Sequence, residues 1–128
     1  MTITPYRVLV TGSRTWTDKQ AIWQALATIA RELPADRDLI VVEGACPNGA
    51  DRIAYEWASS FGAIVEAHPA LWRNHGVYNP QAGLARNRRM VELGADVVLA
   101  FIRNGSRGAS HCADLAEQAG IPVKRWTA

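Results

Sequence analysis

The sequence predicts an α/β fold: a single domain built as a three-layer sandwich around a mostly parallel five-stranded sheet. Short runs rich in β-branched residues alternate with segments of helical periodicity, which is typical of a parallel sheet covered on both faces. The length of 128 residues, with 48% hydrophobic and 20% charged residues, fits one compact globular domain. No internal repeat, low-complexity tract or interdomain linker interrupts the pattern. We therefore expect one domain over residues 1–128.

The first half of the chain supplies three strands and two helices. The first helix is predicted to begin at Thr17, whose side chain would form a capping box with Gln20, and to end before Pro34. Apolar residues recur at helical spacing between these positions. The second helix is predicted over 49–61, with Asp51 in its first turn, where an acidic group is favourable. The predicted strands of this half are 7–11, 39–42 and 63–67.

The second half supplies two strands and two helices. The helices are predicted over 82–93 and 108–119, and a glycine follows each of them, as is common at helix C-termini. The strands are predicted over 96–101 and 122–126.

Residues 68–83 fit neither a strand nor a helix pattern. Prolines, glycines and asparagines interrupt any period in this segment, and a loop of this length in a compact domain is usually functional or disordered. Because Leu71, Trp72 and Tyr78 are costly to leave in a solvated linker, we predict that the segment is a lid over a ligand site.

The order of the elements predicts where a ligand would bind. Right-handed crossovers, with a change of winding direction after the third strand, give the Rossmann-like strand order 3-2-1-4-5. The first and fourth strands are then neighbours at the point where the connections diverge. In open parallel sheets, ligands bind at the carboxyl ends of the strands at such a point.

Turns that contain glycine and arginine follow these two strands. Residues 10–14 are Val-Thr-Gly-Ser-Arg, and residues 104–108 are Asn-Gly-Ser-Arg-Gly. Backbone N–H groups freed by glycine, the positive N-terminal end of a helix and a nearby guanidinium all favour phosphate. The sequence therefore predicts one phosphate-binding cleft between the two turns. Its candidate residues are Gly12, Ser13, Arg14, Gly105, Ser106, Arg107 and Gly108.

The third predicted helix and the second predicted strand add polar candidates. Arg86 precedes Met90 by one helical turn, so we predict that Arg86 faces the cleft, whereas Arg88 and Arg89 face solvent. Either Glu43 or Asp51 would hydrogen-bond ribose hydroxyls; pairing of a carboxylate with Arg14, or capping of the following helix, is an equal alternative. The remaining polar-site candidates are Gly44 and Asn87.

Two tryptophans are candidates for a stacking platform. Trp16 and Trp72 lie in loops at the expected ligand-binding edge, where an aromatic ring would stack on a base. Packing in the core or at its rim is the commoner fate of a tryptophan, so this alternative stays open for both.

Charge and composition limit the classes of binding partner that we expect. The formal net charge of +2 and the pI near 8.8 are well short of the clustered positive charge of sequence-independent nucleic-acid binders. Nucleic acid stays open as a partner but is not favoured. We expect a soluble, cytoplasmic protein with no membrane partner, because no targeting segment or bilayer-spanning run occurs. Cys46, Cys112 and the three histidines lack metal-ligand spacing, so we predict no metal site and no disulfide. We also expect no cofactor.

As a set, these motifs resemble the YspA/YpsA-related SLOG superfamily. The resemblance covers essentially the whole chain and rests on residues 11–14, 43–45, 49–51, 86–90 and 104–108. That superfamily includes the Lonely-guy cytokinin-activating phosphoribohydrolases and the Smf/DprA DNA-processing proteins. The resemblance implies a Rossmann-like, SLOG-like domain that binds nucleotides or nucleotide-derived ligands, such as ADP-ribose-like molecules, often as signals. It also implies a homodimer through helix faces.

The sequence departs from the Lonely-guy pattern at a catalytic position. Those enzymes carry a PGGxGTxxE turn, whose glutamate acts with an arginine to cleave an N-glycosidic bond. Aligning residues 105–109 with this turn puts Cys112 at the glutamate position and Asn104 at the proline, while Arg86 fits the arginine. A cysteine does not readily replace a carboxylate in this chemistry. Glu43 is then the candidate catalytic carboxylate, and whether the protein is an enzyme stays open.

Three functions follow. We expect a module that senses or sequesters a phosphoribosyl-containing small molecule. The first alternative is a nucleotide hydrolase that uses Glu43 or Asp51 as its carboxylate. The second is an accessory of single-stranded nucleic-acid processing that resembles DprA, for which the arginines of residues 86–89 are the only support in the sequence.

Overall fold

The fold is an α/β sandwich with one five-stranded parallel sheet. The computed structural model describes residues 4–128, so the first three residues of the predicted domain lie outside the described part. The strands of the sheet are β1 (Tyr6–Gly12), β2 (Leu39–Glu43), β3 (Ile64–Ala67), β6 (Val97–Ile102) and β7 (Val123–Thr127). Their order is β3-β2-β1-β6-β7. Because β6 and β7 are the fourth and fifth strands of this sheet, the predicted Rossmann-like order 3-2-1-4-5 is confirmed.

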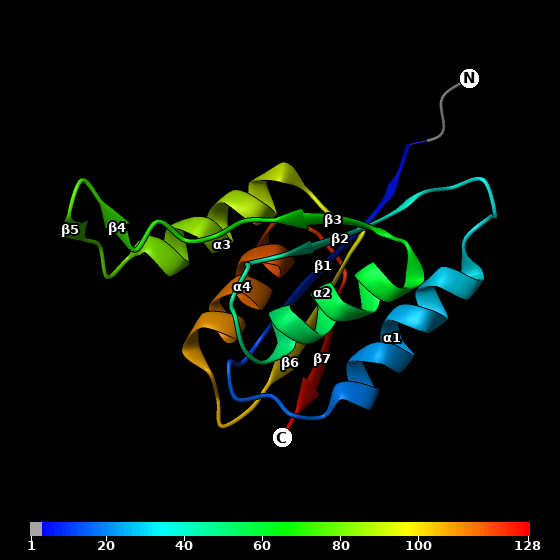
Figure 1. The fold of residues 1–128 in the computed structure, drawn as a ribbon, viewed down its shortest axis with the longest axis horizontal. Helices are drawn as coiled ribbons and strands as arrows, with labels where there is room; N and C mark the ends of the chain where they lie inside the picture. Colours follow the sequence, from blue (N-terminus) through cyan, green and yellow to red (C-terminus); the bar gives the residue numbers. More distant parts are fainter. Residues whose placement is uncertain (1–3) are drawn as a thin grey trace.

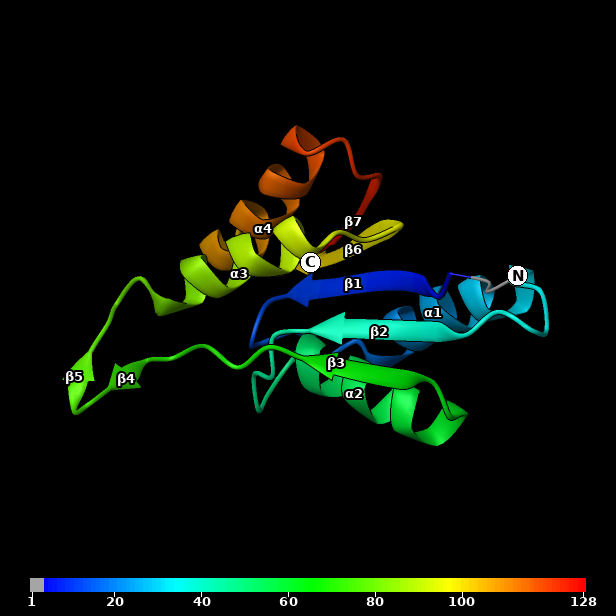
Figure 2. The same ribbon diagram turned by 90° about the horizontal axis from the view of Figure 1, so that it is seen from above.

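Four helices cover the two faces of the sheet. They are α1 (Lys19–Glu32), α2 (Ala50–Phe61), α3 (Ala82–Leu93) and α4 (Arg107–Gln118). Figure 2 shows α1 and α2 on one side of the sheet and α3 and α4 on the other. No helix in the described part of the chain is both long and apolar enough to cross a bilayer.

The apolar strands bury both of their faces. Val8 and Val10 of β1 pack in the core under α1 and α2, whereas Leu9 between them packs in the core under α3 and α4. The same alternation continues in β6, all of whose residues are buried. Successive side chains of a strand point to opposite faces, so a continuous apolar run suits a sheet with helices on both sides.

The start of α1 differs from the prediction. Asp18, not Thr17, is the N-cap residue: its Oδ1 accepts a hydrogen bond of 3.1 Å from the Ala21 amide. Asp and Thr both serve as N-caps, so two adjacent candidates leave the position undecided. The expected capping box between Thr17 and Gln20 is therefore wrong by one residue.

The segment from residue 68 to residue 83 contains a short β-hairpin. Its strands, β4 (Arg73–Asn74) and β5 (Val77–Tyr78), are antiparallel and extend away from the rest of the fold, to the left in Figure 1. His75 and Gly76 form the turn with positive φ angles of 52° and 79°, as two-residue hairpin turns require. The prediction of no strand in this segment was wrong, because strands of two residues show no periodicity.

Candidate functional site

A cavity of about 450 Å³ lies at the carboxyl ends of β1 and β6; we call it the main cavity. The turns after both strands contribute to its wall, so the structure brings together the two segments that the sequence analysis paired. Of the predicted ligand-binding residues, those that line it are Gly12, Ser13, Arg14, Gly44, Asp51, Trp72, Arg86, Asn87, Ser106 and Gly108. Trp16, Gly105 and Arg107 are not among its lining residues.

The turn after β1 is held by contacts within the protein. The Ser13 amide donates to the Phe101 carbonyl at 2.9 Å, and Ser13 Oγ accepts from the Arg103 amide at 2.7 Å. The amide of Ser13 is therefore occupied within the protein, although Ser13 itself lines the main cavity. A Cβ atom at Gly12 would lie 2.4 Å from the Cβ of Ala50, so the close approach of α2 requires this glycine.

The first turn of α4 faces the main cavity. Ser106 is the N-cap residue of α4, but its side chain makes no capping hydrogen bond. The first N–H groups of a helix have no partner within the helix, and they carry the positive end of its dipole. Ser106, Gly108 and Ala109 line the cavity, so this end of α4 is suited to an anion. Gly105 and Arg107, which were also predicted to contribute to the cleft, are exposed and lie outside the cavity lining.

Arg103 is a lining residue that the sequence analysis missed. It directly follows β6, and its Nη1 donates to the Thr15 carbonyl at 2.8 Å, which links the turns after β6 and β1. Its position immediately after a central strand was the signal available, since residues at that edge face the point where the connections diverge.

Arg86 lies in a cradle of backbone carbonyls. Its Nη1 donates to the carbonyl of Gly44, and to that of His68 at 3.3 Å, while its Nε donates to Asn87 Oδ1 at 2.8 Å. A Cβ atom at Gly44 would lie 2.4 Å from Nη1, so only glycine leaves room for the guanidinium. Buried Asn87 also donates to the Gly108 carbonyl at 3.2 Å, which ties α3 to α4.

Trp72 is the tryptophan that borders the main cavity. The Arg14 guanidinium carbon lies 5.5 Å from its ring centroid, within the range of a cation–π contact. The ring of Tyr78 stacks on it at 6.3 Å between centroids. Of the predicted lid, Trp72 and Pro80 line the cavity, together with Gly83 at its end.

Trp16 lies in the core and not in the cavity wall. Its side chain is 5% exposed, and its ring packs edge-on against Phe101 at 5.5 Å. Its Nε1 donates to the Asp18 carbonyl at 2.9 Å, which satisfies the indole N–H. Trp16 is therefore no stacking platform in this structure, because its faces pack within the protein.

Two buried carboxylates lie at the end of β2 and the start of α2. Burial raises the pKa of Glu43 to about 7, although its side chain accepts a hydrogen bond from the Ala45 amide. Burial likewise raises the pKa of Asp51 to about 6, and Asp51 accepts from the Cys46 amide at 3.3 Å. Glu43 lines a neighbouring cavity of about 310 Å³ and not the main one, whereas Asp51 lines both. Asp51 is thus the carboxylate closest in position to the predicted ligand site.

The sequence of this chain is similar to that of a protein family and to that of a phage protein. The sequence model of the "YspA, cpYpsA-related SLOG family" matches residues 6–75, more than half of the chain. The chain belongs to this SLOG family. It is also 45% identical, over 122 residues, to "Gene 61 protein" of Mycobacterium phage D29, which covers 91% of this chain and 93% of the phage protein. Within this SLOG chain, Arg86 and the turn after β6 lie beyond the residues that the family model matches.

Cys112 of this SLOG protein lies in the hydrophobic core under α4. Its side chain is buried among residues such as Leu9 and Met90, and burial raises the pKa of its thiol to about 11. Cys112 is not among the residues that line the main cavity. The position that aligns with the Lonely-guy glutamate is therefore filled by a protonated core thiol, as expected of a small buried cysteine.

Proposed function

We propose that this SLOG protein binds a nucleotide or nucleotide-derived small molecule, phosphoribosyl or ADP-ribose-like, and acts as a sensor or sequestering module. One observation carries the proposal: Arg14, Arg86 and Arg103, from three different segments, line one cavity with the uncapped start of α4. Guanidinium groups and a helix N-terminus together favour a phosphate.

Different lining residues would bind different groups of the ligand. Arg103 and the first turn of α4 would hold a phosphate, and Arg86 would bind a second negatively charged oxygen of the ligand. Asp51 would accept hydrogen bonds from ribose hydroxyls. Trp72 would stack on the base. Micromolar affinity needs about 8 kcal/mol. Charged hydrogen bonds contribute roughly 1.5–3 kcal/mol each and base stacking about 1–3 kcal/mol, so these few contacts suffice after entropic losses.

Native mass spectrometry and calorimetry test this proposal. A spectrum of protein taken from its expression host would reveal a co-purifying nucleotide by its mass. Calorimetric titrations with AMP and with ADP-ribose then measure affinity for wild type, for Arg86→Ala and for the matched control Arg88→Ala on the exposed face of α3. We expect Arg86→Ala to weaken binding at least tenfold and Arg88→Ala to leave it unchanged. Wild-type protein that carries no nucleotide and binds neither probe would overturn the proposal.

A hydrolase is the second candidate, because Asp51 borders the main cavity with a pKa near 6. A carboxyl group with a pKa close to the operating pH is suited to general acid or base chemistry. Incubation with AMP and ADP-ribose, followed by chromatography, separates the two functions. Intact ligand supports binding alone, whereas release of free base that disappears in Asp51→Asn supports hydrolysis.

A cytoplasmic location agrees with this function. Both cysteines, Cys46 and Cys112, are free thiols, which suits a reducing compartment. Fractionation of cells that produce the protein would test the location.

A further inference from the structure

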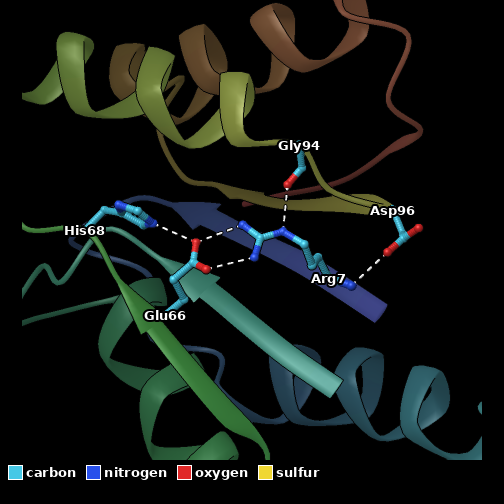
Figure 3. Close-up of polar contacts among 5 residues, drawn as sticks. All are labelled: Arg7, Glu66, His68, Gly94 and Asp96. Atoms are coloured by element: carbon cyan, nitrogen blue, oxygen red, sulfur yellow. Dashed lines mark hydrogen bonds and ion pairs between the residues drawn. The ribbon is translucent and has the colours of Figure 1, made fainter. Parts of the chain in front are cut away.

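An ion-pair network crosses one face of the sheet (Figure 3). Glu66 of β3 accepts hydrogen bonds from Nη1 and Nη2 of Arg7 of β1, both at 2.8 Å. His68 Nε2 lies 2.7 Å from the Glu66 carboxylate. Since β2 lies between β1 and β3, the Arg7 side chain reaches across β2 to make this pair. We call Arg7, Glu66 and His68 the Arg7 network.

All three guanidinium nitrogens of Arg7 make hydrogen bonds. The pair between Arg7 and Glu66 is bidentate, and the two side chains are only 22% and 33% exposed. The hydrogen bond from Arg7 lowers the pKa of Glu66 to about 2. The third nitrogen of the guanidinium, Nε, donates to the Gly94 carbonyl at 3.0 Å. Such a fork of parallel hydrogen bonds fixes the geometry of both partners.

The Arg7 network contacts two structural features that position Arg86: a backbone carbonyl that accepts from its guanidinium and the helix that carries it. The carbonyl is that of His68, which accepts from Arg86 Nη1 at 3.3 Å, while the His68 amide donates to the Glu43 carbonyl at 2.9 Å. The helix is α3, which carries Arg86 and ends at the Gly94 that Arg7 binds. The Arg7 network therefore holds in place the residue whose carbonyl accepts from Arg86, which is His68, and the C-terminal end of α3.

We infer that Arg7, Glu66 and His68 are positioning residues, which hold Arg86 at the main cavity without touching the ligand. This inference rests on the proposed function, since it assigns a role in ligand binding to residues outside the cavity lining. Breaking the network frees the His68 carbonyl and the end of α3 to shift, so Arg86 loses its fixed orientation.

A matched pair of substitutions tests the inference by AMP calorimetry. Glu66→Gln removes the charge that pairs with Arg7 and His68. Glu56→Gln makes the same change in the exposed pair between Arg52 and Glu56, which lies 3.2 Å apart within α2. We expect Glu66→Gln to weaken AMP binding about threefold to thirtyfold, the usual range for residues that act through others, and Glu56→Gln to leave it unchanged. Equal affinity in wild type and Glu66→Gln would overturn the inference.

A second readout needs no ligand. The NMR resonance of the Arg86 Nε–H, assigned by its loss in Arg86→Ala, reports the hydrogen bond to Asn87. We expect Glu66→Gln and the milder His68→Gln to shift or broaden this resonance, and Glu56→Gln to leave it in place. A lowered melting temperature with an unmoved resonance would mean that the network only stabilises the fold, which also overturns the inference. If wild type carries no nucleotide and binds neither AMP nor ADP-ribose, the proposed function fails, yet this resonance still reports whether the network positions Arg86.

Discussion

Ser13 and Arg103, 90 residues apart in the sequence, exchange two hydrogen bonds between the ends of β1 and β6. The Arg103 amide donates to Ser13 Oγ at 2.7 Å, and Ser13 Oγ donates to the Arg103 carbonyl at 3.3 Å. The Ser13 hydroxyl thus links the two turns that line the main cavity. These hydrogen bonds hold the cavity wall in place without a ligand, which would reduce the ordering cost of the proposed binding.

Replacing Ser13 by alanine should therefore destabilise the fold. The change leaves the partly buried Arg103 amide without its acceptor, which costs about 1–3 kcal/mol. Urea denaturation would measure the loss of free energy of unfolding. Ser59→Ala, on the exposed face of α2, is the control and should stay within about 0.5 kcal/mol of wild type. Equal losses in both variants would contradict the role assigned to Ser13.

Adding a methyl group at Gly44 should displace Arg86. The new Cβ would lie 2.4 Å from Arg86 Nη1 and 2.9 Å from Asp51 Oδ2, closer than such atoms pack. Because the guanidinium is the end of a flexible side chain, it can move away, so the fold should survive while AMP affinity falls as in Arg86→Ala. Calorimetry of Gly44→Ala checks this. Gly108→Ala is the control for stability: its Cβ would meet nothing within 4 Å, so this variant should be as stable as wild type.

The two candidate tryptophans should behave oppositely when changed to alanine. Trp16→Ala removes a core side chain and should cost about 3–5 kcal/mol of stability. Trp72→Ala should change stability little but weaken AMP binding by the contribution of one base stack, about 1–3 kcal/mol. Thermal melts and calorimetry on both variants measure the difference. A Trp72→Ala protein with wild-type affinity would show that no base stacks there.

Stability should fall as pH rises through the titration of Glu43. Its pKa is raised from 4.5 to about 7, so between these values the native state holds a proton that the unfolded chain has released. The free energy of unfolding then decreases with pH in this window. Glu43→Gln should flatten the decrease between about pH 5 and about pH 8 in urea denaturation.

Two other carboxylates also make the free energy of unfolding depend on pH, and their contributions remain in Glu43→Gln. Asp51, with its pKa raised from 3.8 to about 6, acts in the same direction and leaves part of the slope in Glu43→Gln. Glu66, with its pKa lowered from 4.5 to about 2, acts oppositely: its contribution is present above 4.5 and is lost only as pH falls toward 2. Parallel wild-type and Glu43→Gln profiles from about pH 5 to about pH 8 would contradict the shift of Glu43.

The order of strands and helices was predictable because it depends on local patterns. Apolar runs such as that of β6 and the helical spacing of α1 and α2 lie within single segments of sequence. Once the order was known, right-handed crossovers with a change of winding direction after β3 gave the topology that brings the turns after β1 and β6 together. The hairpin of β4 and β5 escaped prediction because two-residue strands carry no period, and its turn, His75-Gly76, lacks the usual Asn-Gly or Asp-Gly pair.

By itself, the sequence determined the fold and the edge of the sheet where the candidate site lies. The tertiary structure alone decided which residues at that edge remain free to meet a ligand. The Ser13 amide is taken by Phe101, and the ring of Trp16 packs on that same residue, while Arg103 reaches the main cavity. The physical reason is that a backbone amide or an aromatic ring can serve a ligand only when no partner distant in sequence already occupies it, whereas a guanidinium has five N–H donors and can bind the protein and a ligand together. Those partners meet only in the folded chain.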